Sequence, residues 1–193
     1  MAKVKAPLMS FDARGQIAKS LVYLGWKGLK TVRQYVIPAN PKTDDQQQQR
    51  GYFTTAVGLW HTAGFDSGDI KAWKLLALSL KKALSGFNIF VSLIVKTLVA
   101  AVTWDSIYEV DEGTPTSSGT VITAITGSGV TCTVHYGTKI TAMFNTETLA
   151  STLTALEITL TELTASTKYY FYITDDTDPK SARTGIYSFE TTA

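Results

Sequence analysis

Charge and composition change together at residue 102, and this change constrains the fold more than any single motif. Residues 1–102 carry 14 lysines and arginines against 5 acidic residues, a formal charge of +9, whereas residues 103–193 carry 4 against 11, a formal −7. The second segment also holds 23 threonines. Because each segment is long enough to form its own hydrophobic core, we expect two domains, residues 1–102 and residues 103–193.

The basic segment opens with a pattern typical of a β-hairpin. Two runs of β-forming residues, 21–24 and 32–37, flank the sequence Gly25-Trp26-Lys27-Gly28, and glycines around a two-residue tip suit a tight turn. A second turn at residues 12–15 predicts an additional strand over residues 7–11.

Three helices are predicted after the hairpin. Thr43 precedes two acids and a glutamine, as a helix N-cap does, and apolar residues recur at helical spacing up to Trp60. Asp66 or Ser67 caps a second helix. The third, over about residues 88–101, is apolar on most sides, so it needs burial on more than one face, within its own chain or against a partner. Its apolar run is too short to span a bilayer, and no stretch near the N-terminus has the length of a secretory signal, so we expect no membrane association.

A series of short motifs runs in one order through the first segment: Trp26-Lys27-Gly28, Val32-Arg33, Pro38-Ala39-Asn40-Pro41-Lys42-Thr43, Gln47, Arg50, Trp60, Trp73 and Ser85-Gly86-Phe87-Asn88-Ile89-Phe90. This series resembles a module of uncharacterised virion proteins encoded by tailed bacteriophages and prophages, over roughly residues 5–95. The resemblance implies a capsid- or tail-associated protein that is made in the host cytoplasm and located in the virion. It implies no enzymatic activity and defines no functional residues.

Short alternating segments between turn residues fill the acidic segment, at 104–110, 119–126, 130–136, 138–144, 155–160, 168–174 and 185–191. Seven strands in about 90 residues are typical of an immunoglobulin-like sandwich. Leu163, followed six residues later by Tyr169, resembles the fibronectin type III motif in which a tyrosine makes a corner hydrogen bond. The sequence therefore predicts an α+β chain of two domains, a β-hairpin with about three helices and then an all-β fibronectin III-like sandwich.

We expect the basic domain to contain the assembly surface, through the aromatic residues Trp26, Tyr35 and Phe90 and the basic residues Lys27, Lys30 and Arg33. In the sandwich, Tyr170 and Tyr172 alternate with inward-facing residues and are predicted to point outward beside an acidic loop. Exposed aromatic residues there are candidates for binding a glycan or a protein.

No catalytic, cofactor or metal site is predicted. The two histidines, His61 and His135, fall in different predicted domains, and Cys132 lies three residues from His135, which places them on opposite faces of a strand. The aspartates within residues 175–178 lack the glycine and distant glutamate of a calcium loop. We therefore expect a protein that is not an enzyme.

The function predicted from the sequence is that of a structural virion protein of a tailed bacteriophage. Its basic domain assembles with copies of itself and with other virion proteins, and its sandwich is displayed. Two alternatives belong to other classes. A nucleic-acid-binding protein would use the basic half, with an affinity that falls as salt rises. A host-surface or glycan-binding module would use Tyr170 and Tyr172.

Overall fold

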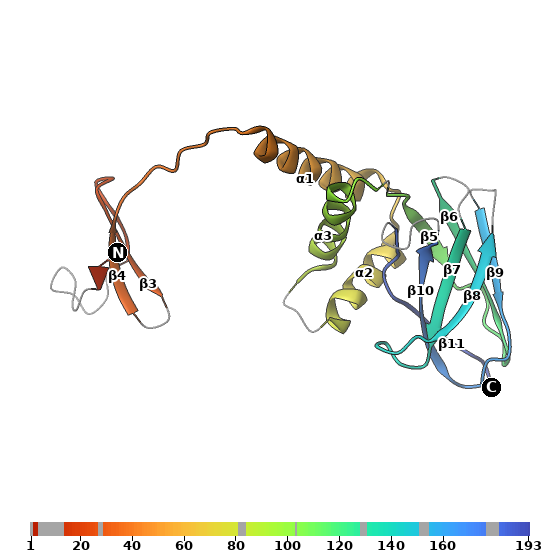
Figure 1. Ribbon diagram of the computed structural model, residues 1–193. Coiled ribbons are helices and arrows are strands. Elements are labelled where there is room, and N and C mark those ends of the chain that lie inside the picture. The colour runs from red at the N-terminus through yellow and green to blue at the C-terminus, as the bar shows by residue number, and fades with distance from the viewer. Residues whose placement is uncertain are drawn as a thin grey trace. The chain divides into compact units, whose positions relative to one another are not determined.

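The computed structural model describes residues 2–3, 14–26, 29–80, 84–102, 104–127, 131–150, 155–176 and 182–193. The chain forms two compact units, Met1–Thr43 and Asp44–Ala193. Together they combine helices with antiparallel sheets, an α+β fold (Figure 1). The boundary between the units lies at residue 43 rather than at residue 102, where composition changes. The reason is that the helices pack directly on the sandwich that follows them, as described below.

The first unit is a four-stranded antiparallel sheet with the order β1-β4-β3-β2. Its strands are β1 (Ala2–Lys3), β2 (Gly15–Ile17), β3 (Leu21–Trp26) and β4 (Leu29–Gln34). The predicted hairpin is present as β3 and β4, paired from Leu21↔Gln34 to Trp26↔Leu29. The strand predicted over residues 7–11 lies outside the described residues.

Three helices open the second unit, α1 (Asp44–Thr62), α2 (Ser67–Ser79) and α3 (Gly86–Val99). Asp66 begins α2 with a capping box, because its carboxylate accepts from the Asp69 amide while the Asp69 carboxylate accepts from the Asp66 amide. The Ser85 hydroxyl caps α3 in a similar way, by accepting from the Asn88 amide. No helix among the described residues is both long and apolar enough to cross a membrane.

Aromatic side chains form the core of the helical layer. Phe90 is fully buried at its centre and makes edge-on contacts with Trp60 and Phe65 at ring-centroid distances of 5.2 Å, and with Trp73 at 5.1 Å. Such edge-to-face pairs stabilise a core beyond the apolar area that they bury. The helix α3 packs against both α1 and α2, so its apolar character is explained by burial within its own chain.

Seven further strands form a two-sheet sandwich, in the orders β5-β6-β9 and β11-β10-β7-β8. They are β5 (Ile107–Asp111), β6 (Thr120–Thr126), β7 (Thr131–Gly137), β8 (Asn145–Ala150), β9 (Ala155–Leu160), β10 (Lys168–Asp175) and β11 (Tyr187–Glu190). Alternate residues of both sheets point into one shared core, which includes Ile122, Val134 and Phe171. The hydroxyl of Tyr169 accepts a 3.0 Å hydrogen bond from the Thr164 amide.

One predicted strand is wrong. Residues 138–144 do not form a strand, and the strand that pairs with β7 is β8, further along the chain. The chain turns at Lys139 and Ala142, whose amide donates to the Lys139 carbonyl at 3.0 Å. Ile140 and Met143 of this segment pack against the helical core instead of the sandwich core.

The helical layer and the sandwich meet at the segment that leads into β11. The amide of Ile186 donates to the Ala72 carbonyl of α2 at 3.0 Å, and Ile186 belongs to the helical core. Gly185 lies so close to α2 that a Cβ at this position would approach the Ala72 carbonyl carbon to 2.3 Å. Backbone contact at this range makes helices and sandwich one unit.

Candidate assembly and binding surfaces

Apolar side chains lie on both faces of the sheet in the first unit. The β3–β4 register places Val22, Leu24 and Leu29 on one face and Leu21 and Val32 on the other. Leu21 and Leu29 are 40% and 45% exposed, and Thr31 is the one buried side chain among the described residues of this unit. A small sheet normally needs a packed apolar face for stability. The described residues of the unit supply no second layer.

Two of the predicted basic assembly residues lie on β4 of this sheet. Lys30 is half-buried and Arg33 is exposed. Their separation by three residues along β4 puts them on opposite faces of the sheet. Tyr35 is half-buried directly after β4, and its amide donates to the Ser20 carbonyl at 2.7 Å. Trp26 closes β3, where its backbone pairs with Leu29.

The side chain of Trp26 and all of Lys27 lie outside the described residues, so the parts assigned to them remain predictions. The segment after Tyr35 has no regular secondary structure up to Thr43, and it carries Val36 and Ile37 at 69% and 75% exposure. Residues 1–43 contain eight lysines and arginines and one acidic residue, a formal charge of +7. The first unit therefore combines a positive net charge with exposed apolar side chains.

Phe90 is not part of any exposed surface, which corrects its prediction as an assembly residue. Its side chain is 0% exposed, because rings from the helices and Trp104, at a centroid distance of 5.8 Å, enclose it. The apolar sequence of α3 was compatible with burial in its own chain or against a partner, and the contacts of Phe90 are of the first kind.

Tyr170 and Tyr172 project from the outer face of β10, as their alternation predicts, but neither is freely exposed. Tyr170 packs against the helical core, and its ring lies 5.6 Å from the Lys168 ammonium. Tyr172 stacks on the His135 ring at 4.7 Å and lies under the Arg183 guanidinium at 4.3 Å. Both rings are half-buried, so the patch is less open than predicted, and binding of a glycan or a protein there stays a prediction.

The polar side chains near Tyr172 form hydrogen bonds with one another. Burial lowers the pKa of His135, and the nearby Arg183 charge lowers it further, while Asp176 acts in the opposite direction. The His135 ring nitrogen Nε2 bonds to the Thr174 hydroxyl at 3.1 Å. Beside it, the Thr133 hydroxyl bonds to the Asp176 carboxylate and lies 2.7 Å from the Thr148 hydroxyl. The hydrogen-bonding groups of these side chains therefore have partners within the fold.

Cys132 is buried in the sandwich core on the opposite face of β7 from His135, as predicted. Burial and the nearby aspartates raise the pKa of its thiol to about 12. A thiol with so little thiolate at neutral pH is a poor nucleophile. Among the described residues, no group of three or more histidines, cysteines and acids could hold a metal ion.

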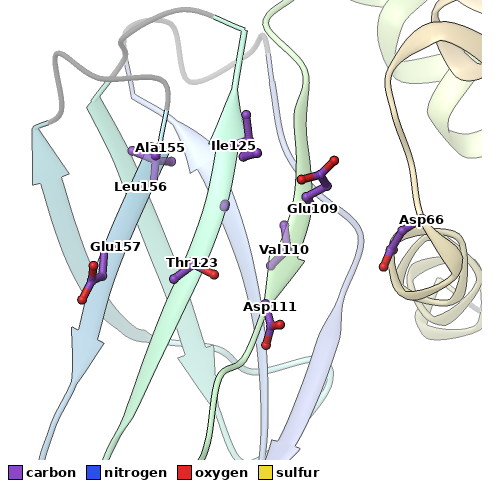
Figure 2. A pocket seen from close by; sticks show the side chains of 10 residues that line it. Asp66, Glu109, Val110, Asp111, Thr123, Ile125, Ala155, Leu156 and Glu157 are labelled. Carbon is purple, nitrogen blue, oxygen red and sulfur yellow. The ribbon is translucent and has the colours of Figure 1, made fainter.

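An acidic groove of about 740 Å³ lies on the outer face of the β5-β6-β9 sheet. Figure 2 shows Glu157 on one side and Glu109 on the other, with Thr123 and Ile125 between them and Asp66 across from β5. The strand β5 has an irregular register between Tyr108 and Asp111, and Glu109 has a positive φ of 50° there. Bulges of this kind turn a side chain away from the regular pleat.

A buried carboxylate positions α2 beside this groove. Asp69 is fully buried and accepts hydrogen bonds from the Tyr187 hydroxyl at 2.5 Å, the Glu109 amide at 3.0 Å and the Asp66 amide at 3.2 Å. Burial and the Asp69 charge raise the pKa of Tyr187 well above its usual range, so its hydroxyl stays a donor. Asp69 has no predicted role from the sequence alone, because its contacts with β5 and β11 depend on the tertiary fold.

No family model and no curated protein matches this sequence. Among solved structures, the sensor domain of the anti-sigma factor RsgI4 in Pseudobacteroides cellulosolvens is similar at 17% identity and a TM-score of 0.34, over 46% of this chain and 93% of that one. Domains d3 and d4 of the rat CD45 extracellular region are similar at 12% identity and a TM-score of 0.36, over 45% of this chain and 48% of that one. Both TM-scores are below 0.5, and neither likeness assigns a function.

Proposed function

We propose that this chain is a structural protein that assembles through Met1–Thr43 and displays Asp44–Ala193. One observation carries the proposal: the sheet of the first unit has apolar residues on both faces and no second layer among its described residues. Ordering such a sheet costs conformational entropy that only burial against another surface offsets. The motif order along residues 5–95 supports a place in the virion of a tailed bacteriophage, in capsid or tail, with other virion proteins and copies of this chain as partners.

The displayed part is a fibronectin III-like sandwich in this proposal. Two features support it: three strands, β5-β6-β9, pack against four, β11-β10-β7-β8, and the Tyr169 hydroxyl accepts from the Thr164 amide as a corner tyrosine does. This fold carries many unrelated functions, so it fits a display module without specifying a ligand. We propose no catalytic role for it.

Nucleic-acid binding is the second candidate, because residues 1–43 have a formal charge of +7. Its affinity for duplex DNA would fall steeply between low and moderate salt, and it would not require contact between copies. The glycan-binding alternative has less support, since Tyr170 and Tyr172 are engaged by neighbouring side chains.

Sedimentation velocity of the full chain and of residues 44–193 tests the proposal. The second unit has its own two hydrophobic clusters, so we expect it to fold alone and to remain monomeric. The full chain is expected to form larger species at micromolar concentration. A full chain that stays monomeric at every concentration would contradict assembly. If that chain also binds DNA in a salt-dependent manner, nucleic-acid binding would be the better-supported function.

A further inference from the structure

We infer that the basic sheet of one copy docks into the acidic groove of a second copy, so that copies associate head to tail. This inference rests on the proposed function and names the partner of its assembly surface. The docking face is the side of the β3–β4 hairpin that carries the exposed Leu29 and Arg33, together with the half-buried Val22 and Leu24 and the buried Thr31.

Charge identifies the second copy as the occupant. Residues 1–43 have a formal charge of +7, whereas residues 44–193 carry 10 basic and 15 acidic residues, a formal −5. Opposite fields of this size raise the rate of encounter and exclude approach of two like surfaces. Two first units would repel each other, and so would two second units. Contact between unlike units is the arrangement that the charges favour.

The groove and the docking face each combine apolar side chains with exposed charges, and the charges are of opposite sign. Ile125 of β6 pairs with Ala155 of β9, Glu109 lies on the neighbouring strand β5, and Glu157 lies two residues along β9 from Ala155. Both glutamates are exposed. On the sheet, Leu29 and Arg33 of β4 are the exposed residues of this face, and Thr31 between them is buried.

Lys19 adds a second cation at the Arg33 end of the sheet. It lies in the turn that enters β3, next to the Leu21↔Gln34 pair, and it is exposed. Exposed ion pairs contribute little individually, so the apolar contact supplies affinity and the charges set orientation and partner. Because the two surfaces differ, each copy has one of each to offer, and the contact generates a ring or a filament.

A paired charge reversal in the full-length chain tests this inference. One variant combines Lys19→Glu with Arg33→Glu, and the other combines Glu109→Lys with Glu157→Lys. In either variant alone, the docking face and the groove carry charges of the same sign and repel each other. We therefore expect the protein concentration needed for assembly to rise by at least about tenfold. An equimolar mixture restores unlike contacts at both interfaces, so it is expected to assemble at the concentration of the unmodified chain.

Glu190→Lys is the matched control, because Glu190 is exposed on β11 and is not among the residues that line the groove. It reverses one charge and is expected to leave assembly unchanged. Full assembly of the Glu109→Lys/Glu157→Lys variant, or failure of the mixture to assemble, would overturn the groove as the partner. The proposed function would survive that result if the full chain still assembles while residues 44–193 alone sediment as a monomer. A full chain that never assembles would overturn both proposals.

Discussion

The hydroxyl of Tyr187 donates a 2.5 Å hydrogen bond to the buried carboxylate of Asp69, and the two residues are 118 positions apart in the sequence. Asp69 belongs to the first turn of α2 and Tyr187 begins β11. The bond fixes the start of a helix against a strand of the sandwich. It is one reason why the helices share a compact unit with the sandwich and not with the hairpin sheet that precedes them.

Tyr187→Phe is expected to lower the free energy of unfolding by about 1–3 kcal/mol, because a buried carboxylate loses a hydrogen-bond donor while the ring remains. Chemical denaturation measures the change. Tyr108→Phe is the control: Tyr108 is a half-buried tyrosine of β5, and its hydroxyl removal should change stability by well under 1 kcal/mol. Equal effects for the two substitutions would contradict the assignment of Asp69 as the link between helix and sandwich.

Gly185→Ala should destabilise the second unit by about 1–3 kcal/mol, because its Cβ would meet the α2 backbone at 2.3 Å. Gly58→Ala tests the opposite case. Gly58 is exposed within α1 and nothing lies within 4 Å of a Cβ there, so this substitution should stabilise by about 1 kcal/mol through helix propensity. Thermal or denaturant unfolding of both variants measures the sign of each change in unfolding free energy. A neutral Gly185→Ala would mean that the helices do not approach β11 so closely.

The free energy of unfolding should fall as the pH rises above about 9. The pKa of Cys132 is raised from 9.0 to about 12 in the folded chain, so its contribution is complete below pH 9 and is lost as pH rises toward 12. Tyr187 acts in the same direction at higher pH, since its pKa is also raised by folding. Denaturation between about pH 8 and pH 10 should show a shallower decline for Cys132→Ala than for the unmodified chain. Parallel declines would contradict a buried neutral thiol.

Phe90→Ala and Leu29→Ala should affect different properties. Phe90 is enclosed by aromatic rings, so its truncation should cost about 3–5 kcal/mol of unfolding free energy while leaving the assembly midpoint unchanged in the folded protein. Leu29 is 45% exposed on the docking face, so its truncation should weaken assembly and hardly change unfolding of the second unit. Sedimentation and denaturation of both variants separate the two roles, and the reverse pattern would contradict them.

Local signals predicted the helices and the hairpin well. Asp66 caps α2, as its position before the second helix predicts, and β3 and β4 pair up to Trp26 and Leu29 beside the glycines of the predicted hairpin tip. These features depend on contacts within a few residues, which the sequence order itself brings together. The outward alternation of Tyr172 follows from strand geometry in the same way.

What the sequence could not predict depends on contacts between distant segments. Composition separates residues 1–102 from 103–193, yet Ala72 and Ile186 join them through a backbone hydrogen bond, which side-chain composition does not reveal. The packing of Tyr170 on the helical core was missed for the same reason. A third helix that is apolar on most sides was the available signal, since it required a second surface, and Tyr170 packs against the core to which α3 belongs.

Hydrogen exchange of the strand amides in β3 and β4, measured over a range of protein concentrations, tests the central claim most directly. If the sheet of the first unit depends on contact with another copy, its amides should exchange rapidly in dilute solution and become protected as assembly proceeds, while amides of β7 and β10 stay protected throughout. Equal protection of β3 and β4 at all concentrations, in a chain that sediments as a monomer, would contradict assembly through this sheet.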